Sequence, residues 1–287
     1  MKIEKIELDN TIVFTSLELK EKHKILLFFT SRKGGFSSGE YRSLNLGYHT
    51  GDDPENVSKN RNKLLKIFSS SGVSGMFSLN QIHGDNIFDI NNEFIENNPE
   101  LIKNTPSFSV HSPSDISADG LITNISMIPL MVMGADCNLI LMADVKKKAV
   151  AAIHAGWKGV LKKIELKAVN MFKANYGSDL EDIFVFIGPS IRNCCFKVTK
   201  ETLDLFTNIY KNNLPSKRLK KDSGNTDYYS VDLVRIIKNN LINSGIPKNN
   251  ITDSGMCTFC NEDNLFFSYR KEKITGRHAG IIMIEQN

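Results

Sequence analysis

The sequence lacks any hydrophobic run that approaches the length of a membrane span, which argues against a helical membrane protein. Its N-terminus, MKIEKIELDN, alternates charged residues with Ile and Leu, unlike a secretory signal peptide. The excess of positive charge is small, with 36 Lys and Arg against 32 Asp and Glu, too little to indicate nucleic-acid binding. We therefore expect a cytoplasmic protein with no nucleic-acid partner and no membrane partner.

Cysteine is also scarce. Five cysteines among 287 residues are an odd number at low density, so reduced thiols are expected rather than a disulfide framework. The remaining composition, 41% hydrophobic and 24% charged, is ordinary for a globular protein that can bury a sizeable core. The composition therefore sets the broad class of the protein but not its chemistry.

Short apolar segments dominate the predicted secondary structure. Strands are predicted at 11–16, 24–31, 76–84, 118–124, 129–136, 138–144, 149–156, 182–190, 249–257, 265–269 and 279–286. Helices are predicted at 53–70, 157–177, 199–213 and 231–245. A long loop at 31–54 and a surface insertion at 91–117 are also expected. We predict an α/β (α+β) fold, a single domain over residues 1–287 with mixed β-sheets layered between α-helices.

Three residues with metal-binding side chains stand at the ends of apolar segments. His83 ends NQIHGD, Cys137 follows MVMGAD, and His154 ends AVAAI. If these ends meet, a His₂Cys set would suit zinc, with copper as the alternative, and would leave a fourth position open for water or substrate. The spacings of 54 and 17 residues match no compact metal motif. On spacing alone, buried structural roles are therefore favoured.

Basic residues in the first quarter of the chain carry a weaker signal. The stretch SRKGGFS combines Arg32 and Lys33 with a Gly-Gly turn that could hold a phosphate. It is neither a Walker loop nor a dinucleotide fingerprint. Arg61, on the polar side of the predicted helix 53–70, is either a surface residue or an anion clamp.

Two motifs near the C-terminus are ambiguous. CTFC, at 257–260, is a Cys-x-x-Cys pair, but the adjacent pair at 194–195 has the wrong spacing for the other half of a zinc ribbon. We interpret these thiols as structural or incidental, with redox activity as a minor alternative. Further on, Arg277 and His278 face either a cleft or solvent, and the local sequence does not decide between them.

The motifs NQIHG, ADGLIT, ADC, AAIHAGWKG, IGPSIRNCCFKV, CTFC and FFSYRKEKITGR follow TSRKGGFSSGEYRSLNLG in one order. This set resembles the polyphenol-oxidase (laccase-domain) family, whose members are understood as purine nucleoside phosphorylases. The likeness runs from about Thr30 to the C-terminus. It implies a zinc ion held by His83, Cys137 and His154, with copper as the alternative metal.

The resemblance also implies an activity and its substrates. Members of the family phosphorolyse adenosine, inosine and 5′-methylthioadenosine and deaminate adenosine, so purine nucleosides and phosphate are the expected partners. Asp136 is then a candidate for proton transfer or for support of its metal-binding neighbour, or it only forms a turn. Candidates for the phosphate site are Arg32, Lys33 and Arg61, with Asn45 of SLNLG as a polar contact.

The chain departs from the family pattern beside the cysteine. Pro is usual two residues after it, whereas this sequence reads ADCNLIL, with Asn138 and Leu139. The change removes no ligand but alters the backbone next to the pocket. Alternatives are a copper-dependent polyphenol oxidase, a hydrolase that edits peptidoglycan precursors, a metal-stabilised binding protein, and a hydrolase with Cys137 as nucleophile. The sequence does not fix the oligomeric state, and a monomer is the simplest expectation.

Overall fold

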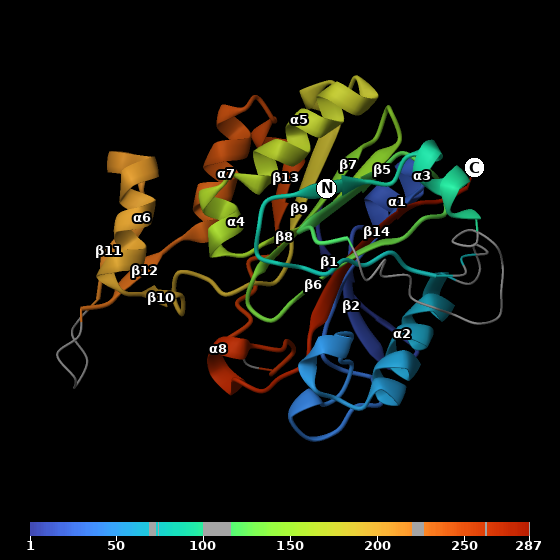
Figure 1. Ribbon diagram of the computed structural model, residues 1–287, viewed down its shortest axis with the longest axis horizontal. Coiled ribbons are helices and arrows are strands. Elements are labelled where there is room, and N and C mark those ends of the chain that lie inside the picture. The colour runs from blue at the N-terminus through green and yellow to red at the C-terminus, as the bar shows by residue number, and fades with distance from the viewer. Residues whose placement is uncertain (69–72, 74, 100–115, 220–226, 262, 287) are drawn as a thin grey trace.

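Two β-sheets packed face to face form the centre of the molecule in the computed structural model of the chain (Figure 1). The structure describes all residues except 69–72, 74, 100–115, 220–226, 262 and 287. The first sheet has five antiparallel strands, in the order β1 (Glu4–Leu8), β2 (Thr11–Thr15), β3 (Ile25–Thr30), β14 (His278–Ile284) and β6 (Leu130–Gly134).

The second sheet has six strands, in the order β13 (Ile251–Asp253), β9 (Ile183–Ile187), β7 (Asn138–Asp144), β8 (Ala149–Ala155), β5 (Gly120–Thr123) and β4 (Ile87–Asp89). Its two outer pairs are parallel and its inner pairs are antiparallel. A small third sheet is formed by β10 (Lys197–Val198), β12 (Tyr229–Val231) and β11 (Ser216–Arg218).

In the described part of the chain, eight helices surround the sheets, and some of them cover the outer faces of the two large sheets. They are α1 (Leu17–His23), α2 (Pro54–Phe68), α3 (Asn92–Asn97), α4 (Trp157–Leu161), α5 (Ile164–Tyr176), α6 (Lys200–Tyr210), α7 (Leu233–Asn243) and α8 (Tyr269–Glu272). Figure 1 shows α4, α5 and α7 along the six-stranded sheet and α2 on the opposite side of the molecule. Within the described ranges, no helix combines the length and the apolar character that a membrane span requires.

The side chains of β7 show why both sheets are so apolar. Leu139 and Leu141 pack between the two sheets, whereas Ile140 and Met142 pack under the helices. Successive residues of a strand point to opposite faces, so a strand buried on both sides needs apolar residues throughout. On the far side of the five-stranded sheet, Leu64 of α2 closes a third core cluster. The predicted α/β fold, with mixed sheets layered between helices, is confirmed.

Several predicted elements differ from those in the structure. The segment 157–177 is two helices rather than one, because Lys163 adopts a left-handed conformation with φ of 58° between α4 and α5. The segment 76–84 forms only isolated bridges, and the strand follows at β4. Residues 265–268 are buried without joining a sheet, and the exposed Tyr269 begins α8, so the apolar character of the predicted strand 265–269 reflects burial rather than strand pairing. Most of the predicted insertion at 91–117 lies outside the described residues.

Candidate functional site

Antiparallel pairing of β7 and β8 brings two of the predicted metal ligands together. Asn138, at the start of β7, pairs with Ala155 at the end of β8, so Cys137 and His154 stand at the same edge of the sheet. His83 reaches this edge from the segment that precedes β4, and its ring meets that of His154 edge-on at 4.8 Å between centroids. One ligand atom from each of the three residues lies within 4.8 Å of the others.

Asp119 positions both histidines, and the sequence interpretation missed it. Its Oδ1 lies 2.8 Å from Nδ1 of His154 and accepts the backbone N–H of His83 at 2.9 Å. Its Oδ2 accepts the N–H of Gly84 at 2.5 Å. A carboxylate only accepts, so His154 carries its proton on Nδ1 and presents Nε2 to the cavity edge. The motif ADGLIT contained this residue, but its partners depend on strand pairing that the motif does not reveal.

The charges of the cluster depend on one another. Burial alone would raise the pKa of the Cys137 thiol, but His154 and His83 lower it to about 6. Burial alone would lower the pKa of His154, but Cys137 and Asp119 raise it to about 9. The site therefore holds the thiolate of Cys137 beside the positively charged imidazole of His154. When His154 loses its proton, a metal cation can supply the positive charge beside the thiolate instead.

The donor set and the space around it fit zinc. Two imidazoles and one thiolate are among the ligands that zinc prefers, and three protein ligands leave an open position. Gly156 keeps the site accessible, since a Cβ there would lie 3.0 Å from Cδ2 of His83 and 3.2 Å from Sγ of Cys137. The residues present would therefore hold a His₂Cys metal ion without rearrangement of the backbone.

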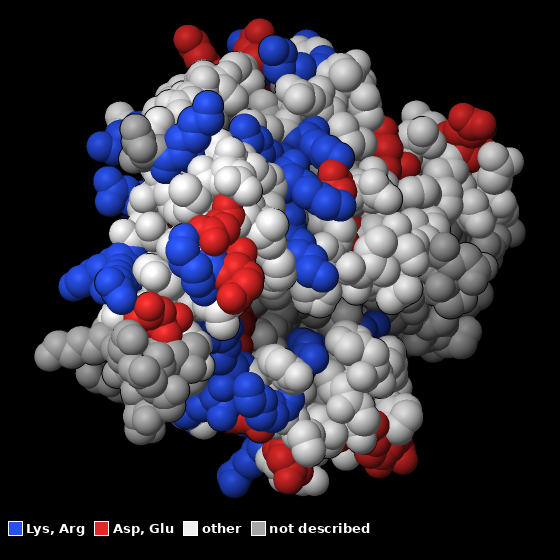
Figure 2. All heavy atoms as spheres, turned by 60° about the vertical axis from the view of Figure 1, so that its left-hand side comes forward, with Lys and Arg blue, Asp and Glu red and all other residues white. Residues whose placement is uncertain are grey.

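The three ligands open into a cavity of about 730 Å³, a size typical of small-molecule sites. Its wall combines aromatic rings with cationic side chains. The aromatic members are Tyr48, Trp157, Phe196 and Tyr269, and the arginines are Arg61, Arg270 and Arg277. On the side of the molecule that carries α6 and α8, Figure 2 shows Lys and Arg side chains at the edge of a central hollow.

Two of the cavity arginines are available to an anion. Arg61 is 2% exposed, donates from Nε to the carbonyl of Leu46 at 2.7 Å, and lies 4.4 Å from the ring centre of Tyr48. Burial lowers its pKa to about 10, so it stays charged at neutral pH. Arg277 donates to two backbone carbonyls. Among the described residues, none of the three cavity guanidinium groups forms an ion pair with a carboxylate within 4.0 Å, and that of Arg270 donates to the carbonyl of Lys197.

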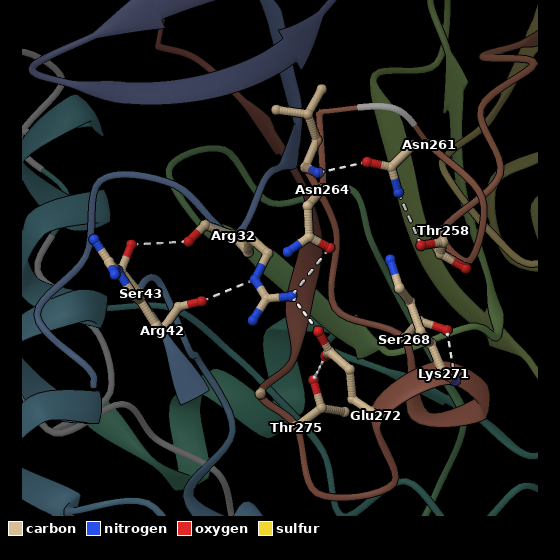
Figure 3. A network of polar contacts seen from close by, with 12 residues as sticks. Arg32, Arg42, Ser43, Thr258, Asn261, Asn264, Ser268, Lys271, Glu272 and Thr275 are labelled. Carbon is tan, nitrogen blue, oxygen red and sulfur yellow. Dashed lines mark hydrogen bonds and ion pairs between the residues drawn. The ribbon is translucent and has the colours of Figure 1, made fainter. Parts of the chain in front are cut away.

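The other predicted phosphate residues do not line this cavity. Arg32 donates to Oε1 of Glu272 at 2.6 Å and to the carbonyl of Arg42 at 2.8 Å, as Figure 3 shows. Lys33 is exposed on the loop beside it. Asn45 is fully buried, and its amide donates to Thr50 and Asp52. The local sequence shows that these residues are polar, but it does not show which groups they form hydrogen bonds with.

Asp136 is held by donors on the C-terminal segment. Its Oδ1 accepts the hydroxyls of Thr258 and Ser268, each at 2.7 Å, and its Oδ2 accepts the N–H of Arg270 at 2.6 Å. Three donors on one carboxylate support a positioning role for the residue that precedes Cys137. The local sequence did not decide whether Arg277 and His278 face a cleft or solvent. In the structure Arg277 lines the cavity, whereas His278 is fully buried.

The fold and site define a class of protein: a mixed α/β chain with a His₂Cys centre that opens into an arginine-lined cavity. The chain belongs to the family described as multi-copper polyphenol oxidoreductase laccase, whose model matches residues 26–285. The predicted membership is confirmed, and the metal-ligand motifs lie within the matched range.

Relatives and solved structures agree along nearly the whole chain. Purine nucleoside phosphorylase YlmD of Bacillus subtilis is 29% identical over 92% of this chain and 90% of its own. Purine nucleoside phosphorylase YfiH of Escherichia coli is 30% identical over 89% and 92%. The crystal structure of YlmD from Geobacillus stearothermophilus is 25% identical, covers 98% of both chains and gives a TM-score of 0.81.

Proposed function

We propose that this protein is a metal-dependent purine nucleoside phosphorylase that acts on adenosine, inosine and 5′-methylthioadenosine. The observation that carries the proposal is one cavity that presents a His₂Cys centre, aromatic walls and three arginines that have no carboxylate partner among the described residues. Such a cavity offers a surface for a purine ring and cations for phosphate at the same place. The names of the relatives from Bacillus subtilis and Escherichia coli support the same reaction.

In phosphorolysis, a phosphate oxygen forms a bond to C1′ of the ribose while the C1′–N9 bond breaks. The purine leaves with the bonding electrons and takes up a proton, so the products are the free base and a pentose 1-phosphate. Arg61 and Arg277 would hold the phosphate dianion, since guanidinium groups bind phosphate oxygens in pairs. The aromatic rings of the wall would hold the purine and exclude water.

The metal centre would be held by His83, Cys137 and His154, with zinc favoured by the donor set and copper as the alternative. When bound, such an ion supplies Lewis-acid stabilisation of developing negative charge and activates water near neutral pH. Asp119 keeps the proton of His154 on Nδ1, and so orients the ring for its role as ligand. Deamination of adenosine, in which water replaces the 6-amino group and ammonia leaves, is the proposed side activity.

A second candidate function rests on the pair formed by Cys137 and His154. The thiol interacts with a protonated imidazole that Asp119 orients, an arrangement that also suits a nucleophilic thiolate. A multi-copper phenol oxidase is less well supported, because only one of the two metal-type clusters in the described part of the chain contains histidine. Removal of metal distinguishes the metal-dependent phosphorylase from a hydrolase with Cys137 as nucleophile, since the thiol hydrolase would keep its activity.

The test follows the fate of the sugar. Purified protein is incubated with each nucleoside, with and without phosphate, and the products are separated by chromatography. The proposal expects base release that requires phosphate, produces pentose 1-phosphate rather than free pentose, and stops when a chelator removes the metal. Release of free pentose at the same rate without phosphate would support hydrolysis instead. No turnover of any of the three nucleosides would contradict the proposed function.

A further inference from the structure

The four cysteines other than Cys137 meet at one corner of the six-stranded sheet. Cys194 and Cys195 lie in the turn that follows β9, while Cys257 and Cys260 lie in the loop that follows β13. These two strands are parallel neighbours, so both loops leave the same edge of the sheet (Figure 1). The fold thus brings Cys194 and Cys195 next to the Cys-x-x-Cys pair, although their spacing in the sequence is wrong for a zinc ribbon.

The distances fit a single tetrahedral ion. One sulfur from each of the four cysteines lies within 4.8 Å of all the others, and the sulfurs of Cys194 and Cys260 are 3.6 Å apart. A zinc ion bound by four thiolates at about 2.3 Å would place its sulfurs about 3.8 Å apart. All four thiols are free, and a disulfide would require a sulfur–sulfur distance of about 2.05 Å.

The two turns that carry the four cysteines are held together by contacts that do not involve the sulfurs. Arg192, on the turn of Cys194 and Cys195, donates from Nε to the carbonyl of Met256 at 3.0 Å and from Nη1 to Asp253 at 2.8 Å. Ser190 pairs with Cys257, and its carbonyl accepts the N–H of Thr258, so the two turns are already joined by backbone contacts.

We propose that Cys194, Cys195, Cys257 and Cys260 bind a second zinc ion, separate from the ion of the cavity. This site joins the loops after β9 and β13 and has no open position, so its role is structural. It acts next to the cavity, because Thr258, between two of the ligands, donates to Asp136, the neighbour of Cys137. Cys260 and Cys194 are exposed, so the ion lies near the protein surface.

The experiment counts zinc in full-length protein purified with a reductant and without added chelator. The expected content is two zinc ions per chain in the wild type, and one each in Cys260→Ser and in the matched control Cys137→Ser. The double variant is expected to hold none. Cobalt loaded into Cys137→Ser should give the intense visible bands of tetrahedral thiolate coordination, and these should be absent when Cys260→Ser is added.

Several results would overturn the proposal. Zinc content that is the same in Cys260→Ser as in the wild type would do so, as would iron in place of zinc at this corner. A disulfide among these four cysteines in reduced preparations, detected by peptide mass spectrometry, would also contradict it. If Cys260→Ser does not fold, thiol labelling of the native wild type with peptide mapping decides: we expect the four thiols of this corner, in addition to Cys137, to become reactive only after zinc removal. Because these readouts are metal and thiol counts, they stand apart from the test of nucleoside turnover.

Discussion

The carboxylate of Asp119 lies 2.8 Å from Nδ1 of His154. His154 stands near the end of β8, and the neighbouring strand β7 begins directly after Cys137. The same carboxylate accepts the backbone N–H of His83, so one side chain orients two of the three proposed metal ligands. It fixes which nitrogen of His154 is free to bind. The geometry of the metal centre therefore depends on a residue that does not bind the metal itself.

Replacement of Asp119 tests this dependence. Asp119→Asn removes the negative charge that stabilises the Nδ1 proton of His154, so metal affinity is expected to fall about 10–100-fold. Competition with a chelator of known affinity measures the change. The matched control is Asp89→Asn, in which the altered carboxylate bonds Asn175 and Tyr176 instead. Equal affinity in Asp119→Asn and the wild type would contradict the assigned role.

Asp136 is expected to act through position rather than through proton transfer. Asp136→Ala leaves the hydroxyls of Thr258 and Ser268 without their acceptor, so we expect a loss of stability of about 1–3 kcal/mol. Asp136→Asn retains an acceptor oxygen, and its pH–rate profile should keep the shape of the wild-type profile. Thermal unfolding and the pH dependence of kcat/KM measure these effects. Disappearance of one limb of the profile, at unchanged stability, would show proton transfer instead.

The cavity arginines predict how the enzyme responds to phosphate. Arg61→Lys and Arg277→Lys keep the charge but lose paired hydrogen bonding, so the KM for phosphate should rise roughly tenfold. The KM for the nucleoside should change less. Steady-state kinetics with phosphate varied provides the measurement, and Lys59→Ala, on the exposed side of α2, is the control. If both arginine variants keep the wild-type KM for phosphate, the anion binds elsewhere.

Buried Glu165 predicts a pH-dependent stability that is independent of the metal. Burial raises its pKa to about 7, with one oxygen bonded to Asn240 at 2.6 Å. The folded state therefore holds a proton that the unfolded state releases near pH 4.5, and the free energy of unfolding falls as pH rises from about 4.5 to 7. Glu165→Gln should remove this loss, up to roughly 3 kcal/mol.

Thermal unfolding of the wild type and Glu165→Gln at pH 5 and pH 8 tests the direction of this pH dependence of stability. The variant should be more stabilised, relative to the wild type, at the higher pH. Glu181→Gln, on the surface turn before β9, is the control and should show no such difference. An equal effect of Glu165→Gln at both pH values would mean that the buried carboxyl does not titrate in this range.

The sequence predicted those features of the fold and site that depend on residues close together along the chain. The burial of β7 and β8 on both faces follows from their apolar runs, and these runs place Cys137 and His154 at strand ends. The roles of Asp119 and Asn45 could not be predicted, because their partners come from segments that only the fold brings near. The four-cysteine cluster was missed for the same reason, since its ligand spacing has meaning only when β9 and β13 are neighbours.

The central claim is that the His₂Cys centre and the phosphate-dependent reaction belong to one site. The most direct measurement determines bound metal and phosphate-dependent base release together, in the wild type and in His83→Ala, Cys137→Ser and His154→Ala. His23→Ala, on helix α1, is the control. The account predicts that each ligand variant loses one metal ion per chain and the release of base, while the control retains both. Base release that persists after that metal is lost would contradict it.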